Sequence, residues 1–379
     1  MEQLVTFSAA MTAHINYAMQ QNAVPVIRSI IMTNISDRKL KNVFLRLTFD
    51  PDFAEGYESA VIDLEPDTPA EISPVGAVMR PEVFLAIDGN SEGYVRIEAV
   101  TLTAEGEVIL GREVKKLELL ARDTWTGVNF MPELAAAFIT PNHPAVREVL
   151  SKASEIMAKQ GGEPSFTGYL TRNPNIVRQQ INAIYTAISN ENITCIQPAS
   201  GFDKVQKVTM PDEVLSGRSG TSLDLALLFC SCFEAAGLNS LLVMTSTHAM
   251  AGCWLEEDSF PDSLQYDMTA LTKRMANGVD EISLIECTDI CTENDAEASA
   301  VHAADVLAKA ADFCFAIDVS RTRSSGIKPV PSLEPDGNGG FRIVDHGLPG
   351  RRDTPADGVS PDNITDVGSP RVICLTISS

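Results

Sequence analysis

The chain has 379 residues, of which 44% are hydrophobic and 21% charged, and these values are typical of a globular protein. Its formal net charge of -22 argues against direct binding of nucleic acid, because such binding needs clustered Lys and Arg. No apolar run of about 18 residues is present and the first residues lack a signal-peptide pattern, so we expect no membrane span and a cytoplasmic location.

The first 120 residues are predicted to form short strands. Val, Ile, Leu and Phe partly alternate with polar residues, and turn-forming pairs such as Pro66-Asp67 separate the runs. This spacing predicts an immunoglobulin-like β-sandwich over residues 1–120, which we interpret as a packing or docking module. The predicted strands are Val24–Thr33, Val43–Asp50, Gly93–Thr103 and Glu107–Leu117.

Helical periodicity begins after a Trp- and Pro-containing junction, and we interpret residues 121–200 as a helical connector. Apolar residues spaced by three and four predict helices at Ala145–Gln160 and Asn175–Ser189. Residues 201–332 are predicted to be a compact core of α+β class, in which a helix is followed by antiparallel strands. Its helix is Thr221–Ala236, and its strands are Ser240–Thr245, Ala249–Leu255 and Ile282–Cys287.

The C-terminal part of the chain has a different composition. The acidic, Ala-rich segment Glu293–Ala311 is predicted to be a solvated amphipathic helix. Pro, Gly, Asp and Arg dominate residues 334–362 without apolar periodicity. We therefore predict a flexible tail over residues 333–379.

The eight cysteines are irregularly spaced and do not form the pattern of a disulfide framework. Cys230 and Cys232 lie in an apolar, helix-like stretch, so we expect reduced thiols in a core. His14, His302 and His346 lack the spacing to Cys or acidic residues that zinc sites need. We therefore expect neither a metal site nor a cofactor.

Three separated segments supply the residue types of a nucleophilic hydrolase. Ser222 stands in the first turn of a predicted helix, where unpaired N–H groups and the helix dipole lower the pKa of a thiol and stabilise an oxyanion. His248 begins a predicted strand and can act as general base, while an acidic residue can orient its ring. We expect Ser222 and His248 to form a catalytic site with an acidic residue, either Glu286 or Asp289.

The same residues also have a structural interpretation. Thr221-Ser222-Leu223-Asp224 matches the acidic form of a capping box, in which Asp224 caps the helix and is not a catalytic acid. An isolated His248 is more typical of a core histidine, and Glu286 could pair with a nearby Lys or Arg. We prefer the site because these residues follow one another in the order of a known enzyme family.

Gly220-Thr221-Ser222-Leu223-Asp224, the helix end Glu234-Ala235-Ala236-Gly237-Leu238 and His248-Ala249 resemble the transglutaminase-like superfamily of papain-fold enzymes. Glu286-Cys287-Thr288 is similar to the Asp-Pro-Thr segment where that superfamily usually keeps its acid. The resemblance therefore favours Glu286 as the catalytic acid beside Ser222 and His248, with Asp289 as the alternate acid. The resemblance covers roughly residues 205–290. It implies a papain-like fold and amide hydrolysis or acyl transfer on protein substrates, but the superfamily has Cys where this chain has Ser222.

A longer similarity, from about Leu120 to Pro331, is to the N-terminal region of large bacterial helicase-like proteins, some associated with defence against phage. In those proteins a β-sandwich and a transglutaminase-like module precede a superfamily 1 helicase and a nuclease-like end. The sequence contains no Gly-x-x-x-x-Gly-Lys-Ser/Thr loop. The resemblance therefore implies a protein partner, or a further C-terminal portion, that supplies the helicase motor. The matching segments include Asp123–Gly127, Asn173–Asn175, Leu223–Leu228 and Ala249–Leu255.

Ser222 leaves three explanations open. A hydroxyl is far more basic than a thiol, so the helix dipole cannot produce an alkoxide near pH 7. The nucleophile could be lost, the site could work as a Ser-His-Glu hydrolase, or a nearby thiol could substitute. Cys230 and Cys232 are poor substitutes because they lie roughly 12 to 15 Å along the helix. We favour the first explanation, a disabled cysteine hydrolase with an interaction or regulatory role.

Overall fold

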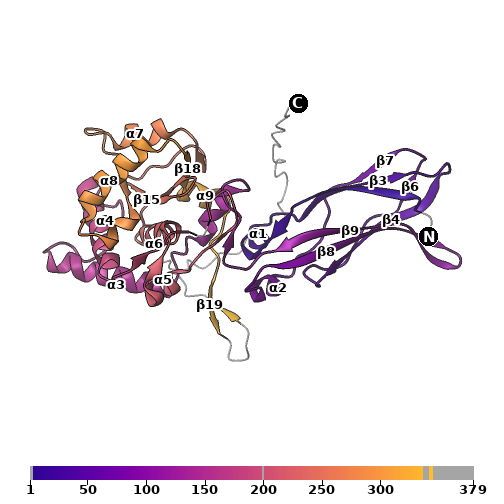
Figure 1. Cartoon of the computed structure of the whole chain (residues 1–379), viewed down its shortest axis with the longest axis horizontal. Coiled ribbons are helices and arrows are strands. Elements are labelled where there is room, and N and C mark those ends of the chain that lie inside the picture. The colour runs from indigo at the N-terminus through magenta and orange to yellow at the C-terminus, as the bar shows by residue number, and fades with distance from the viewer. Residues whose placement is uncertain (1–2, 199, 336–340, 345–379) are drawn as a thin grey trace, which may run out of the picture. The chain divides into compact units, whose positions relative to one another are not determined.

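The computed structural model describes residues 3–198, 200–335 and 341–344 (Figure 1). Helices and several separate sheets are both present, which confirms the predicted α+β class. The contacts of the chain group residues 1–346 as one unit. The boundaries predicted inside it, near residues 120, 200 and 332, stay predictions.

The first 120 residues form two sheets. Strands β1 (Val5–Met11), β3 (Ile27–Asn34) and β7 (Pro69–Ile72) make one antiparallel sheet. The second sheet is built on the hairpin of β8 (Ser91–Thr103) and β9 (Gly106–Leu119). The four strands predicted here are all present. The other elements are β4 (Leu40–Asp50), which pairs with β8, the short strands β2 (His14–Ile15), β5 (Tyr57–Glu58) and β6 (Ile62–Leu64), and helices α1 (Tyr17–Gln21) and α2 (Pro81–Ala86).

A five-stranded antiparallel sheet forms the centre of the second half of the chain. Every residue of two of its three inner strands, β14 (Ser240–Thr245) and β15 (Ala249–Trp254), is buried. Leu241 and Val243 pack into one hydrophobic cluster and Leu242 and Met244 into another, so alternate side chains enter cores on opposite faces. Both faces of this sheet are therefore covered. The strand order is β16 (Leu264–Gln265), β18 (Phe313–Asp318), β14, β15 and β17 (Ile282–Ile285).

Helix α6 (Ser222–Ala235) packs on one face of this sheet, and α7 (Met268–Met275) and α8 (Ala296–Lys309) pack on the other (Figure 1). Helices α3 (Pro144–Lys159) and α4 (Pro174–Ser189) pack against α6, and α4 also contacts α8. The first twelve residues of α6 are all buried, which explains why its sequence has no polar stripe. The helices predicted at α3, α4, α6 and α8 are all present.

The remaining elements are short. They are the 3-10 helix η1 (Pro132–Phe138), helices α5 (Pro211–Gly217) and α9 (Val319–Ser324), and strands β10 (Thr124–Trp125), β11 (Thr194–Cys195), β12 (Gln206–Lys207) and β13 (Ser219–Gly220). Strand β11 pairs in parallel with β13, which leads directly into α6. Of the helices in the described part of the chain, none is long and apolar enough to traverse a bilayer.

The predicted flexible tail, 333–379, lies mostly outside the described residues. Its described part is not featureless, because β19 (Ser332–Pro335) pairs with β20 (Phe341–Val344) in antiparallel register. In the sequence, the turn-forming residues Gly337-Asn338-Gly339-Gly340 stand between these two short runs. Averaging the composition over the whole segment concealed the two strands.

We expect Gly111→Ala to destabilise the N-terminal sheets. A Cβ atom at this position of β9 would lie 2.2 Å from the carbonyl oxygen of Val5 in β1, so the backbone of one strand has to move. The free energy of unfolding, measured by urea denaturation, should fall by roughly 1–3 kcal/mol. Gly89→Ala is the control, because no atom lies within 4 Å of the added methyl. Equal stability of the two variants would contradict this account.

Candidate active site

The opening turn of α6 is fixed by a reciprocal pair of hydrogen bonds. The hydroxyl of Thr221, the N-cap residue, accepts the N–H of Asp224 at 3.3 Å, and the Asp224 carboxylate accepts the N–H of Thr221 at 2.9 Å. The other carboxylate oxygen of Asp224 accepts the N–H of Thr209 at 2.8 Å. The predicted capping box is confirmed, and it holds Ser222 at the first helical position.

His248 lies directly before β15, after the short loop that joins β14 to β15. The hydroxyl of Thr245 accepts the backbone N–H of His248 at 3.0 Å, and the N–H of Thr245 donates to the carbonyl of His248 at 2.9 Å. These bonds close the loop and fix the backbone that carries the imidazole. The side chain of His248 is 29% exposed, so solvent and a substrate can reach it.

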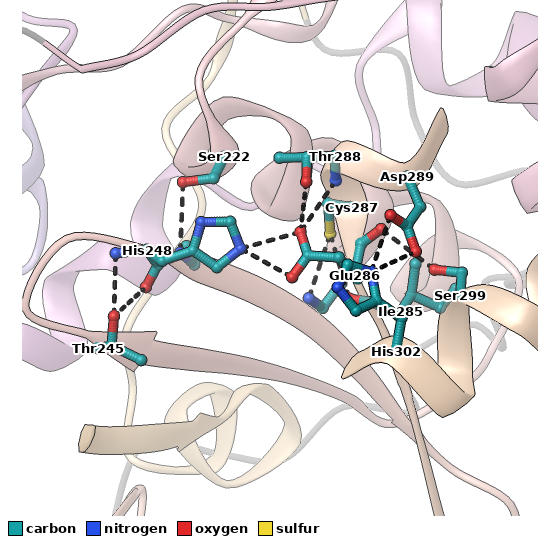
Figure 2. Close-up of polar contacts among 12 residues, drawn as sticks. Ser222, Thr245, His248, Ile285, Glu286, Cys287, Thr288, Asp289, Ser299 and His302 are labelled. Atoms are coloured by element: carbon teal, nitrogen blue, oxygen red, sulfur yellow. Dashed lines mark hydrogen bonds and ion pairs between the residues drawn. The ribbon is translucent and has the colours of Figure 1, made fainter. Parts of the chain in front are cut away.

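Three elements converge at one edge of the central sheet (Figure 2). Strands β15 and β17 are antiparallel, with Ala251 opposite Ile285, so the start of β15 adjoins the end of β17. His248 precedes β15 and Glu286 follows β17, and this topology brings them together. The first turn of α6 reaches the same edge, because the Ser222 hydroxyl accepts the N–H of Ala249 at 3.3 Å.

Glu286 and His248 are in direct hydrogen-bond contact. Nε2 of His248 lies 2.9 Å and 2.8 Å from the two carboxylate oxygens of Glu286, which is only 2% exposed. The N–H and the hydroxyl of Thr288 donate to the same carboxylate at 3.2 Å and 2.6 Å. Burial raises the pKa of Glu286, but the hydrogen bonds from His248 and Thr288 outweigh it and hold that pKa below its ordinary value. The carboxylate is therefore ionised at neutral pH.

The ring of His248 has one nitrogen left for chemistry. Because Nε2 contacts Glu286, only Nδ1 can take a proton from a nucleophile, and Figure 2 shows the ring between the Ser222 hydroxyl and the Glu286 carboxylate. Within the described residues, however, no hydrogen bond joins that hydroxyl to the ring. The base is assembled, but it is not engaged with Ser222.

The first turn of α6 also presents hydrogen-bond donors. In the described part of the chain, the N–H groups of Ser222 and Leu223 have no acceptor, as expected at the first two positions of a helix. Such groups stabilise negative charge that develops beside them. They therefore lie where an oxyanion would form on a substrate attacked at position 222.

Asp289, which we expected as the alternate acid, does not contact His248, and this expectation has to be corrected. Its carboxylate lies 3.0 Å and 2.9 Å from Nδ1 of His302 in α8. The cause is the 3-10 helix η2 (Cys287–Cys291), which turns the chain directly after Glu286. Sequence analysis included Thr288 in the segment of the site without giving it a role, and it missed His302 as a neighbour of the site. Ser299 and His302 are three residues apart on a predicted helix, and this spacing was the sequence feature that places both side chains on one face of α8.

The native thiols of this region are not activated. Cys230 and Cys232 are fully buried, and burial raises the pKa of both. Cys195 lies opposite Gly220 in β11, close to the first turn of α6, and burial raises its pKa to about 11. None of the three is a thiolate at neutral pH. Among the described residues, no three His, Cys, Asp or Glu side chains cluster closely enough to hold a metal ion.

Comparisons with known proteins add no relative. No protein-family model, no curated protein and no solved structure matches the chain. The resemblance to the transglutaminase-like superfamily therefore rests on the residue pattern. The function has to be inferred from that pattern together with the geometry of Ser222, His248 and Glu286.

We expect Glu286→Gln to flatten the dependence of stability on acid pH. The pKa of Glu286 is lowered in the folded chain, so its contribution is complete above its ordinary pKa of 4.5 and is lost as pH falls through the folded value. Urea unfolding from neutral pH to about pH 3 should show a shallower decline in this variant. Glu297→Gln, an exposed glutamate in the first turn of α8, is the control and should keep the native slope. Parallel slopes in all three proteins would refute the assignment.

Proposed function

We propose that this chain carries a papain-like, transglutaminase-like hydrolase site that has lost its nucleophile and now serves an interaction or regulatory role. The observation that carries the proposal is the contact between the half-buried His248 and the buried Glu286 beside the first turn of α6, with a serine at position 222. A base and an orienting acid are retained in contact. The residue that they would activate is a hydroxyl that does not bond to the base.

The arrangement of elements supports this proposal. A buried helix begins at position 222 and packs on an antiparallel sheet, a histidine begins one strand of that sheet, and an acid ends the next. This is the order expected of a papain-like core, in which the nucleophile stands at a helix N-terminus. By the same inference, the two N-terminal sheets would form an immunoglobulin-like sandwich that serves for docking.

The chemistry of serine explains the loss of activity. At the first turn of a helix a thiol loses its proton, because the dipole and the nearby imidazole stabilise the thiolate. A hydroxyl stays protonated there and needs the base to remove its proton during attack. The Ser222 oxygen instead accepts the N–H of Ala249, so it holds α6 against β15. We infer a structural role for this hydroxyl.

An active amide hydrolase is the second candidate, and the ionised Glu286 with its bound imidazole favours it. Oγ of Ser222 would attack the carbonyl carbon of a protein amide while its proton passes to Nδ1 of His248. The N–H groups of Ser222 and Leu223 would receive the oxyanion. The imidazolium would then protonate the leaving amine, and water would hydrolyse the acyl-enzyme by the same steps in reverse.

We further propose that the module works beside a helicase or ATPase motor in a bacterial defence assembly. This proposal rests on the sequence similarity over residues 120–331. The strongly acidic composition is consistent with it, since contact with the nucleic acid would fall to the motor and not to this chain. The partner would then be a protein, or a further portion of the same polypeptide.

Ser222→Cys should restore an activated nucleophile. We expect the introduced thiol to react with iodoacetamide at neutral pH roughly tenfold or more faster than Cys291, the exposed native thiol that serves as internal reference. Peptide mapping by mass spectrometry measures both rates in one sample. Adding His248→Ala should return the introduced thiol to the ordinary rate. If the introduced thiol reacts no faster than Cys291, the hydrolase-site proposal fails.

The native chain should not react with a fluorophosphonate probe, because Ser222 is not hydrogen-bonded to its base. Intact-mass measurement after incubation gives the degree of labelling. Ser222→Ala is the matched control for background reaction at other hydroxyls. Stoichiometric labelling that disappears in Ser222→Ala would establish the second candidate in place of the first.

A further inference from the structure

The turn that follows β17 contains two buried carboxylates. Glu286 is 2% exposed and Asp289, three residues later in η2, is 3% exposed. Two buried carboxylates on one turn repel each other when both are charged, and each then requires its own compensating partner. The partner of Glu286 is His248, which leaves the charge of Asp289 to be balanced by another group.

That group is His302. Its Nδ1 lies 3.0 Å and 2.9 Å from the two carboxylate oxygens of Asp289, and its side chain is 49% exposed. The turn therefore holds two histidine–carboxylate pairs, one at the candidate active site and one on its far side (Figure 2). Only the first pair is used in the proposed chemistry.

Helix α8 links the second pair to the backbone of Glu286. The hydroxyl of Ser299 donates to the carbonyl of Glu286 at 3.1 Å, and His302 follows Ser299 by three residues on the same face of the helix. The N–H of Asp289 donates to that same carbonyl at 3.0 Å. Moving Asp289 or α8 would therefore displace the residue that orients His248.

We propose that Asp289 and His302 are positioning residues for this site, and that they balance the charge of the turn that presents Glu286 to His248. The inference deepens the proposed function and rests on it for the role of Glu286. Asp289 thus acts through Glu286 and never touches the reacting atoms.

The charges around His302 support an electrostatic link to the site. The hydrogen bond with Asp289 raises the pKa of His302, and the charges of Glu286 and Asp305 raise it further. Burial raises the pKa of Tyr185 in α4 to about 12, and the charge of Asp289 adds to this increase. Since the charge of Glu286 acts on His302, the charge of His302 acts equally on Glu286. The stabilisation from this histidine is complete below its ordinary pKa of 6.5 and is lost as pH rises through the folded value.

The first test uses the native serine and requires no activity. The NMR titration midpoint of the His302 ring should fall in Glu286→Gln, because the charge that favours the protonated ring is removed. Glu297→Gln, which removes a charge from the first turn of the same helix, should leave the midpoint unchanged. An unchanged midpoint in Glu286→Gln would overturn the proposed link.

The second test separates charge balance from simple packing. In the Ser222→Cys background, His302→Gln keeps a donor for Asp289 but leaves its charge unbalanced, so the pH midpoint of iodoacetamide alkylation of the introduced thiol should rise. Adding Asp289→Asn removes that charge, and the midpoint should return to the value for Ser222→Cys alone. If Asp289 and His302 had only a packing role, the alkylation midpoint of the double variant would differ from that of Ser222→Cys at least as much as the midpoint of the single variant does. That result would overturn the proposal. If the thiol introduced by Ser222→Cys is alkylated no faster than Cys291, the proposed function fails. The titration of His302 still decides whether the Asp289–His302 pair is linked to Glu286.

Discussion

The contact between Nε2 of His248 and the buried carboxylate of Glu286 organises the second half of this chain. A charged carboxylate that is only 2% exposed is tolerable only when hydrogen bonds compensate for its lost hydration. Here the compensation comes from two directions, from the imidazole before β15 and from Thr288 in η2. The pairing of β15 with β17, the loop at Thr245 and the docking of α8 all serve to bring these groups into contact.

Ser222 shows how a reactive position and a structural one can coincide. The hydroxyl that would attack a substrate also accepts the N–H of Ala249 and so connects the first turn of α6 to the sheet. This bond does not require a thiol, and serine makes it well. A serine at this position forms the hydrogen bond between helix and sheet but lacks the readily ionised thiol of a cysteine.

Much of the central architecture could be predicted from the sequence, because α3, α4 and α6 have helical apolar spacing and β14 and β15 are continuous apolar runs. The order of elements predicted that Ser222 and His248 would lie beside an acid, and the family resemblance favoured Glu286 over Asp289 for that position. Asp289 was misassigned because a 3-10 turn rotates it away from His248, and neither propensity nor periodicity reports such a rotation. Strand β1 was missed because its Ala and Ser residues give a weak strand signal.

The enclosure of α6 has a consequence for how such a domain can change over time. Its first twelve residues are packed on every side, so nearly any substitution along the helix disturbs the core. Position 222 is different, because exchanging oxygen for sulfur there alters reactivity far more than volume. Under the proposed function, selection for folding alone would thus preserve most of the residues around position 222 after catalysis was lost.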